Sequence, residues 1–300
     1  MLTDLNKVVI YGSLAYDRVM DFPGRFKDNF LAQKLHAINV SFAVPTLKEG
    51  FGGTAGNISY NLSLLKIKPT IIGVAGNDFS KYKVWLRSHK VVTKFIRLAQ
   101  NLATASAYII TDKDDNQIAG FYYGAMSLSY QKYPKSLFKK SLIVIAPGNS
   151  KDMNQLVQVC LKHHWPFIYD PGQQITSIRP TELRLGAFNA EVFIGNDYEI
   201  SLVAKKLNIS EKKLINNCRV LIRTLGVKGS EIWVDGRLMR IKAVKAGKVV
   251  DPTGAGDAYR AGIVYGVLNS WSWRRTGDLA SKIAARAVEK YGTQNHYFKM

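Results

Sequence analysis

The chain has 300 residues, of which 47% are hydrophobic and 21% are charged. This balance is typical of a globular chain with one large domain or two ordinary ones, and it excludes a largely disordered protein. The 42 Lys and Arg residues outnumber the 22 Asp and Glu residues, so the formal net charge is +20. Because the basic residues occur as scattered pairs and form no long run, we predict a basic surface that attracts small anions, and no nucleic-acid partner.

The two cysteines, Cys160 and Cys218, lie in apolar stretches without a CxxC partner or a metal-ligand spacing. This context predicts buried, reduced thiols. The N-terminal segment carries an acid before its first apolar run, which is unlike a secretory signal peptide. No apolar run is long enough to cross a membrane. We therefore expect a cytoplasmic protein with no membrane partner.

Short apolar runs alternate with helical patterns along the chain. We expect strands at 7–12, 69–76, 141–148, 166–172, 191–196 and 219–226, and helices at 57–65, 152–164 and 197–207. Since βαβ units produce this alternation, the sequence predicts an α/β fold in which a mostly parallel sheet lies between helices on both faces.

Three segments depart from this rhythm. Residues 38–46, 106–112 and 117–124 alternate apolar and polar side chains, and a turn-like KDDN segment joins the last two. Such alternation predicts antiparallel strands with one open face. We expect them to form a small sheet that stands off the main body, with a ligand site beneath it.

The segment Asp251–Asp257 reads DPTGAGD and lies between an expected strand at Lys248–Val250 and an expected helix. If that helix begins near Gly254, its first amides can hold a phosphate. Asp257 follows these amides, whereas a capping residue precedes them. We interpret Asp257 as a base that accepts a hydroxyl proton during phosphoryl transfer, for which a near-normal pKa would suffice. A plain turn is the alternative, because Gly, Pro and Asp are ordinary turn residues.

Two further segments carry candidate ligand-binding residues. The adjacent Gly52 and Gly53 indicate a hinge or a close backbone approach, and Asn57 offers a donor and an acceptor to a ligand hydroxyl. Asp17 follows the first strand, where ligands collect in open α/β sheets, and can accept from two neighbouring hydroxyls. A helix cap at Asn57 and a turn acid at Asp17 remain alternatives for each residue alone.

Four ordered motifs, GGTAGN, NDYE, TLGVKG and DPTGAGDAYRAG, together with YGSLAYD near the N-terminus, give the chain a family resemblance. The chain resembles the ribokinase-like, or PfkB, carbohydrate and nucleoside kinases over nearly its whole length. The resemblance implies one ribokinase-like kinase domain, residues 1–300, with a three-layer α/β/α core. It also implies a small β-sheet lid formed by about residues 18–50 and 104–124.

The resemblance also implies roles for the residues of these motifs and the molecules that they bind. The implied cofactors are ATP and Mg²⁺, with a monovalent cation such as K⁺ left open, and the implied partners are small molecules only, for a monomer or a homodimer. The implied residues are Asp257 as base with the anion hole of Gly254, Ala255 and Gly256; Asp17, Gly52, Gly53 and Asn57 for the acceptor; Asn196, Thr224, Gly226 and Gly229 for ATP; and Glu199 for the metal, through water.

Within that family the chain is more similar to the adenosine kinase branch and its bacterial nucleoside-kinase relatives than to ribokinase. This closer similarity rests on Arg260 and on the segments FYYGAM, YDPGQQ and GTQNH. We therefore predict transfer of the γ-phosphoryl group of ATP to the 5′-hydroxyl of adenosine or a related nucleoside. Arg260 would neutralise the phosphoryl group or form a surface salt bridge. The aromatic side chains of Phe42, Phe121 and Tyr123 would stack on a purine or pack the lid itself.

The alternative within the family is a sugar kinase that acts on ribose, fructose or a sugar phosphate. Arg18, Arg25 or Lys48 would then contact the acceptor phosphate. A catalytically silent nucleoside sensor is a further alternative, against which the complete DPTGAGD motif argues. One residue departs from the family pattern: Lys90 stands where family members commonly have a glycine.

Overall fold

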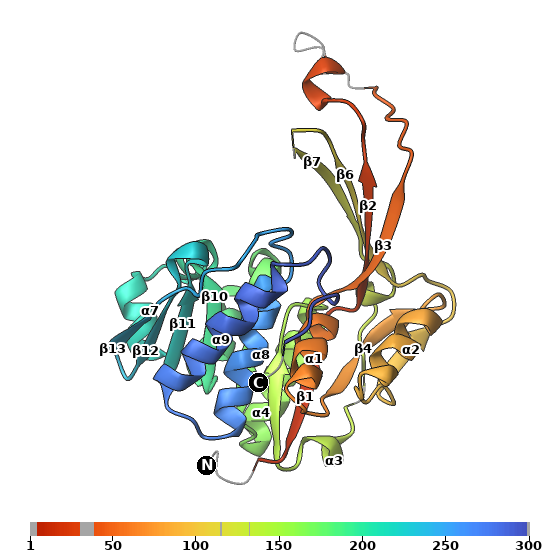
Figure 1. The fold of residues 1–300 in the computed structure, drawn as a ribbon. Coiled ribbons are helices and arrows are strands. Elements are labelled where there is room, and N and C mark those ends of the chain that lie inside the picture. The colour runs from red at the N-terminus through yellow and green to blue at the C-terminus, as the bar shows by residue number, and fades with distance from the viewer. Residues whose placement is uncertain (1–4, 31–38, 115, 132, 299–300) are drawn as a thin grey trace.

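A computed structural model describes residues 5–30, 39–114, 116–131 and 133–298 of the chain. Its larger sheet has nine strands and forms the centre of the main body (Figure 1). The strand order is β13 (Arg237–Ile241), β12 (Ser230–Val234), β11 (Val220–Thr224), β10 (Val192–Asn196), β9 (Phe167–Tyr169), β8 (Ser141–Ile145), β1 (Lys7–Tyr11), β4 (Thr70–Gly76) and β5 (Ile96–Ala99). The strands from β11 to β5 are parallel to one another, and β12 and β13 pair antiparallel at one edge.

Helices cover both faces of this sheet, as strand β1 illustrates. Val8 and Ile10 pack into one hydrophobic core, whereas Val9 and Tyr11 pack into the other, because successive side chains of a strand point to opposite faces. The helices whose buried side chains join the first core are α1 (Thr54–Leu64), α2 (Ser80–Ser88), α8 (Ala255–Leu268) and α9 (Trp273–Ala287). Those that join the second are α3 (Lys135–Phe138), α4 (Ser150–His163), α5 (Pro180–Asn189), α6 (Asp197–Lys206) and α7 (Glu211–Asn217). The predicted three-layer α/β/α fold is therefore confirmed.

A smaller four-stranded sheet, which we call the lid sheet, stands off the main body (Figure 1). Its order is β3 (Leu47–Gly52), β2 (Ala15–Asp21), β6 (Ala105–Thr111) and β7 (Gln117–Tyr122). The β2–β6 pair is parallel and the other two pairs are antiparallel, so the sheet is mixed where the sequence predicts antiparallel strands. The short 3₁₀ helices are η1 (Phe26–Asp28), η3 (Gly124–Ser127), η4 (Gly172–Thr176) and η5 (Gly226–Lys228).

Two strand predictions are wrong. Residues 39–46 are irregular, and residue 38 lies outside the described residues; the strand lies at Leu47–Gly52 instead. Phe42 turns into an aromatic cluster, with its ring centroid 4.8 Å from that of Phe22 and 5.0 Å from that of Phe26. The apolar side chain of Phe42 therefore packs against phenylalanines outside this segment and does not contribute to a strand face.

Residues Lys248–Val250 also form no strand. Val249 and Val250 are 61% and 45% exposed, and the amides of Val250 and Asp251 both donate to the carbonyl of Val288 at the end of α9. The end of this segment is thus held by the end of a helix and not by a neighbouring strand.

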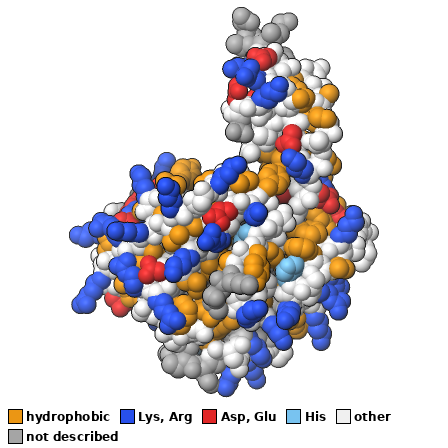
Figure 2. All heavy atoms as spheres, in the orientation of Figure 1, with side chains coloured by type: hydrophobic (Ala, Val, Ile, Leu, Met, Phe, Trp, Pro, Cys, Tyr) orange, Lys and Arg blue, Asp and Glu red, His pale blue; other side chains and the backbone are white. Residues whose placement is uncertain are grey.

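Cys160 and Cys218 are free and buried, as expected. Among the described residues, no helix combines the length and the apolar character needed to cross a bilayer. Lys and Arg side chains are spread over the face seen in Figure 2 and do not gather in a single stripe there.

Lys90 follows the C-cap residue of α2 and has a left-handed backbone conformation with φ of 61°. The amide of Val91 donates to the carbonyl of Leu86, and that of Lys90 donates to the carbonyl of Arg87. These two bonds form a Schellman motif, in which glycine is the usual residue at the position of Lys90. The side chain of Lys90 therefore adds local strain at this position.

We predict that Lys90→Gly raises the free energy of unfolding by up to about 1 kcal/mol, because glycine relieves the left-handed strain. Lys83→Gly in the middle of α2 is the matched control and should lower it by about 1 kcal/mol. Urea unfolding of the three proteins measures both changes. A Lys90→Gly protein that is less stable than the wild type would contradict the prediction.

Candidate active site

The N-terminus of α8 carries the groups of the DPTGAGD segment. Gly254 is the N-cap residue, with a left-handed φ of 78°, and α8 begins at Ala255. The amide of Ala255 makes a long bond of 3.3 Å to the carbonyl of Pro252. Among the described residues, the amides of Gly254, Gly256 and Asp257 have no acceptor. These amides form an open anion-binding end, to which the helix dipole adds partial positive charge.

Asp257 lies in the first turn of α8, beside those amides. Its Oδ2 accepts a 2.9 Å hydrogen bond from Nδ2 of Asn57. Burial raises the pKa of Asp257 to about 6, against the charge of Arg260 and the Asn57 bond, which both lower it. The carboxylate is therefore more basic than the near-normal value that the sequence interpretation required, and it can accept a proton near neutral pH.

Asn57 has its orientation set from both sides. Its Oδ1 accepts a 3.0 Å bond from Nε2 of Gln294, so its Nδ2 must point to Asp257. The N-cap of α1 is Gly53, which excludes the helix-cap alternative for Asn57. The sequence interpretation did not assign Gln294 a role, because nothing in its local pattern indicates a contact with a residue 237 positions away.

A chain of hydrogen bonds continues from Gln294 to the base of the lid sheet. Nε2 of Gln294 also donates to the hydroxyl of Tyr82 at 2.6 Å, and that hydroxyl donates to the carbonyl of Gly52 at 2.8 Å. Gly53 follows with a positive φ of 83°, where a Cβ would lie 2.6 Å from the carbonyl oxygen of Ser13. The two predicted glycines thus join the lid sheet to α1, and only glycine fits there.

Asp17 lies on β2, on the side of the lid sheet that faces a cavity of about 340 Å³. Its carboxylate packs against the Cα of Gly52 so closely that a Cβ there would clash with it. Burial, and next the charge of Asp251, raise the pKa of Asp17 to about 6. The cavity is lined by Asp17, Val19, Lys48, Glu49, Gly50, Phe51, Trp85, Ile109, Asp251, Thr253, Tyr291, Gly292, Thr293, Gln294 and Asn295.

Asp251 is a second carboxylate of this cavity and was not assigned a role from the sequence. Its Oδ1 accepts from the amide of Thr253 and its Oδ2 from the amide of Gly292, each at 2.9 Å. Lys48 lines the same cavity, but its Nζ lies 2.6 Å from Oδ2 of Asp21. The cavity therefore holds more acidic than basic side chains.

Phe121 and Tyr123 do not line this cavity. They are 45% and 56% exposed, with ring centroids 5.4 Å apart in an edge-to-face arrangement. Phe121 pairs with Ala107, and Ala107 pairs with Asp17, so the side chain of Phe121 lies on the same face of the lid sheet as that of Asp17. An aromatic surface is thus available on the lid sheet, two strands away from Asp17.

Arg260 is enclosed and not on the surface, so the surface-salt-bridge alternative is wrong. Its side chain is 11% exposed, and its Nε donates to Oδ2 of Asp170. Its Nη2 lies 3.9 Å from Oε2 of Glu199. The guanidinium is held between two carboxylates below the first turn of α8.

Asn196 and Glu199 form a capping box at the start of α6. Oδ1 of Asn196 accepts from the amide of Glu199, and Oε2 of Glu199 accepts from the amide of Asn196, both at 2.8 Å. Burial, and next the charge of Asp170, raise the pKa of Glu199. Asn196 pairs in register with Thr224, so the ends of β10 and β11 bring these two predicted residues side by side.

Gly226 and Gly229 lie in the connection between β11 and β12, with φ of 57° and 93°. A Cβ at Gly229 would clash with the carbonyl of Ile241, whereas Gly226 has open space around it. Both glycines therefore allow the positive φ angles that the turn after the carboxyl end of β11 requires.

The described residues contain no group of three or more His, Cys, Asp or Glu side chains that could hold a metal. Magnesium commonly keeps several waters and binds through one or two carboxylates together with substrate phosphates. The carboxylate of Glu199, which is 19% exposed, fits such an indirect role.

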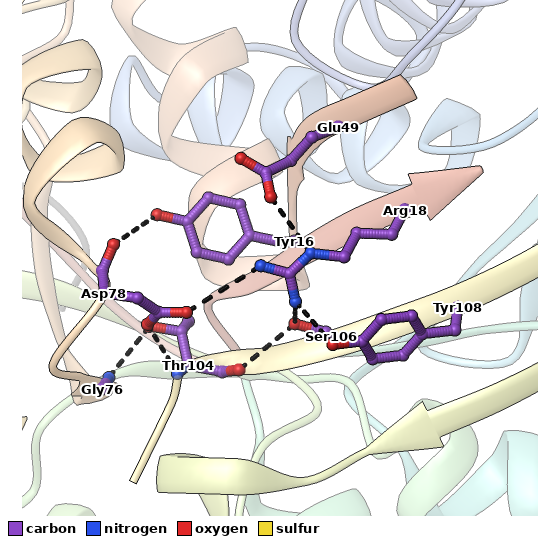
Figure 3. A network of polar contacts seen from close by, with 8 residues as sticks. All are labelled: Tyr16, Arg18, Glu49, Gly76, Asp78, Thr104, Ser106 and Tyr108. Carbon is purple, nitrogen blue, oxygen red and sulfur yellow. Dashed lines mark hydrogen bonds and ion pairs between the residues drawn. The ribbon is translucent and has the colours of Figure 1, made fainter. Parts of the chain in front are cut away.

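Arg18 follows Asp17 on β2, so its side chain lies on the opposite face of the lid sheet. Figure 3 shows the polar contacts that it makes there. Arg18 donates to Glu49 at 3.0 Å, to Ser106 at 2.7 Å and to Tyr108 at 2.8 Å, and its Nη2 lies 3.9 Å from Oδ2 of Asp78 in the main body. These bonds occupy the guanidinium and direct it away from the cavity. The assignment of Arg18 to an acceptor phosphate is therefore wrong, and Arg25 likewise pairs with Asp114 at 2.9 Å.

The three-layer core, the lid sheet and the open helix end beside Asp257 define a phosphotransferase that acts on an alcohol group. The chain belongs to the pfkB family of carbohydrate kinases, whose family model matches residues 5–299. The predicted family, fold class and reaction class are confirmed.

Similar proteins include nucleoside kinases and a sugar-phosphate kinase. The nucleoside kinase of Burkholderia thailandensis in complex with inosine gives a TM-score of 0.85 at 35% identity, covering 96% of this chain and 93% of that chain. A nucleoside kinase of Methanocaldococcus jannaschii is 26% identical, covering 97% of this chain and 93% of its own length. An ATP-dependent 6-phosphofructokinase of Thermoanaerobacterium thermosaccharolyticum is 25% identical, covering 84% and 83%. The protein is therefore a sugar or nucleoside kinase of this family.

We predict that Arg18→Gln loosens the lid sheet, because it removes the charged bonds that join β2 to β3, β6 and Asp78. Amide hydrogen exchange in β2 and β6 should become about tenfold faster, which corresponds to the loss of one or two charge-assisted hydrogen bonds. Exchange in β1 and β8 should not change. Arg25→Gln, which removes an exposed ion pair, is the control, and equal exchange in both variants would contradict the prediction.

Proposed function

We propose that this protein transfers the γ-phosphoryl group of ATP to the 5′-hydroxyl of a nucleoside, adenosine or a close relative of it. The observation that carries the proposal is the carboxylate of Asp257, oriented by Asn57 beside the unpartnered amides of α8. A base next to an anion-binding helix end is what in-line transfer from a phosphate to a hydroxyl requires. The structural similarity to a nucleoside kinase with bound inosine supports a nucleoside as acceptor.

The charge of the acceptor cavity favours a neutral acceptor. The carboxylates of Asp17 and Asp251 line it, whereas Lys48 is already paired with Asp21 and Glu49 with Arg18. These carboxylates can accept hydrogen bonds from ribose hydroxyls, whereas they would repel the phosphate of a sugar phosphate. Phe121 lies on the same face as Asp17. Together with Tyr123, it would offer an aromatic surface to the purine of the nucleoside when the lid sheet closes.

The proposed mechanism assigns one step to each group. Asp17 and Asn57 orient the ribose, and closure of the lid sheet excludes water. Asp257 accepts the proton of the hydroxyl as the hydroxyl oxygen forms a bond to the γ-phosphorus of ATP, and the bond from that phosphorus to ADP breaks so that ADP leaves. The amides at Gly254 and Gly256 stabilise the charge of the transferred phosphoryl group. Mg²⁺ bound with ATP would neutralise phosphate charge, with Glu199 in contact with its water shell. Asn196, Thr224, Gly226 and Gly229 would form the ATP side of the site.

A sugar kinase is the second candidate, which the similarity to a 6-phosphofructokinase and the position of Lys48 in the cavity favour. A coupled ADP-release assay over adenosine, inosine, cytidine, ribose, fructose and fructose 6-phosphate distinguishes the two. We expect turnover with nucleosides, and with adenosine or inosine above cytidine. Turnover of ribose, fructose or fructose 6-phosphate without turnover of adenosine would contradict the nucleoside proposal.

We predict that Asp257→Asn lowers kcat by at least about 100-fold, because the amide cannot accept the hydroxyl proton. The affinity for ATP should stay nearly unchanged. In the wild type, kcat should fall as the pH drops below about 6, the value to which burial raises the pKa of Asp257, because the protonated carboxyl is inactive. The control is Asp152→Asn, a buried aspartate held by Tyr11 and Tyr130. An Asp257→Asn enzyme with near-normal kcat would remove the base assignment.

A further inference from the structure

Asp170 and Arg260 form an enclosed ion pair underneath the N-terminus of α8. Asp170 is 1% exposed and follows β9, where its amide donates to the carbonyl of Ile145 at 2.9 Å. Its Oδ2 accepts from Nε of Arg260, whereas its Oδ1 has no hydrogen-bond partner among the described residues. The remaining side chains around the small void beside the pair are those of Val144, Ile168, Ile194, Ile263 and Val264. The pair is thus placed in apolar surroundings, where a charge is costly and its field is weakly screened.

The guanidinium of Arg260 reaches back to the first turn of its own helix. Arg260 is one turn after Asp257, and long side chains on a helix point toward its N-terminus. A Cβ on Gly256 would lie 2.7 Å from Nη1 of Arg260, so the absence of a side chain at Gly256 makes room for this approach. The positive charge therefore lies against the same turn that carries the open amides and the carboxylate of Asp257.

We propose that Asp170 is a positioning residue for the transfer reaction: it holds the Arg260 guanidinium against the first turn of α8, where that charge sets the electrostatic balance at Asp257. Arg260 acts through this fixed charge. The role differs from that of a mobile arginine that reaches the phosphoryl group directly, because Nε is occupied by Asp170 and Nη2 faces Glu199. The proposal rests on the proposed function, in which Asp257 is the base.

The charged groups around Asp257 act in opposite directions. Burial raises its pKa most, while Arg260 from α8 and the Asn57 bond from α1 lower it. The charges of Asp170 from the end of β9 and of Asp17 from β2 raise it. Glu199 from α6 acts on Arg260 itself. Removing Arg260 and removing the charge of Asp170 are therefore expected to shift the protonation of Asp257 in opposite directions.

A purely structural ion pair would have a different consequence. Breaking an enclosed pair leaves one uncompensated charge and destabilises the protein, whichever role the pair has. A loss of stability alone therefore does not distinguish the two roles. The midpoint of the acid limb of the kcat profile does, because it follows the protonation of Asp257 and not the stability of the fold.

The experiment measures kcat against pH at saturating ATP and adenosine, or the nucleoside that the screen identifies, for four variants. For Arg260→Gln we expect the acid midpoint to rise by about one pH unit, since an attractive charge near the carboxylate is lost. For Asp170→Asn we expect it to fall, since a repulsive charge is lost while the side-chain oxygen of Asn can still accept the bond from Nε of Arg260 and hold the guanidinium in place. Arg260→Lys keeps the charge and should bring the midpoint back toward that of the wild type. Asp152→Asn, an equally buried aspartate in another network, should not move it.

Unchanged midpoints in Arg260→Gln and Asp170→Asn would overturn the proposal. If Asp170→Asn does not fold, the comparison of Arg260→Gln with Arg260→Lys decides, and equal midpoints in both and in the wild type would overturn it. Failure of the proposed function is distinguishable from these results. An active Asp257→Asn enzyme contradicts the base assignment, whereas an inactive one with unshifted midpoints in the other variants contradicts only the role of the pair.

Discussion

The hydrogen bond from Asn57 to Asp257 is the contact on which the rest of the site depends, because it joins side chains 200 positions apart at the starts of two helices. Each partner is held from a different direction. Gln294 determines which end of the Asn57 amide faces the carboxylate, and the first turn of α8 holds Asp257 beside its open amides. A carboxylate that is already oriented has little conformational entropy to lose when a hydroxyl is bound.

The distribution of charge explains how a protein with a net charge of +20 would bind the neutral acceptor that we propose. Asp17 and Asp251 make one end of the site acidic, and the open amides of α8 give the other end partial positive charge. The general basic surface attracts anionic phosphates at long range. Short-range contacts within the site, which are less screened by solvent, then separate the phosphate end from the hydroxyl end.

The lid sheet connects to this arrangement through backbone and side-chain contacts on both of its faces. On one face, Gly52 lies against Asp17 and accepts from Tyr82, which belongs to the same hydrogen-bond chain as Asn57. On the other face, Arg18 joins three strands of the sheet to Asp78 of the main body. A displacement of the lid sheet would therefore disturb the hydrogen-bond chain that orients Asn57 and Asp257.

The sequence by itself determined six of the nine strands of the main sheet, the helix that begins at the DPTGAGD segment and the family, because hydrophobic periodicity and short glycine motifs are local properties. It predicted no strand at β5, β12 or β13. Local patterns failed where tertiary contacts took over: Phe42 packs into an aromatic cluster, and the amides of Val250 and Asp251 bond to the end of α9. Only the tertiary structure decided that Gln294 orients Asn57, that Arg260 pairs with Asp170 and that Arg18 faces away from the acceptor. Each of these contacts joins residues far apart in the chain, and their geometry depends on how the layers pack, which no local pattern encodes.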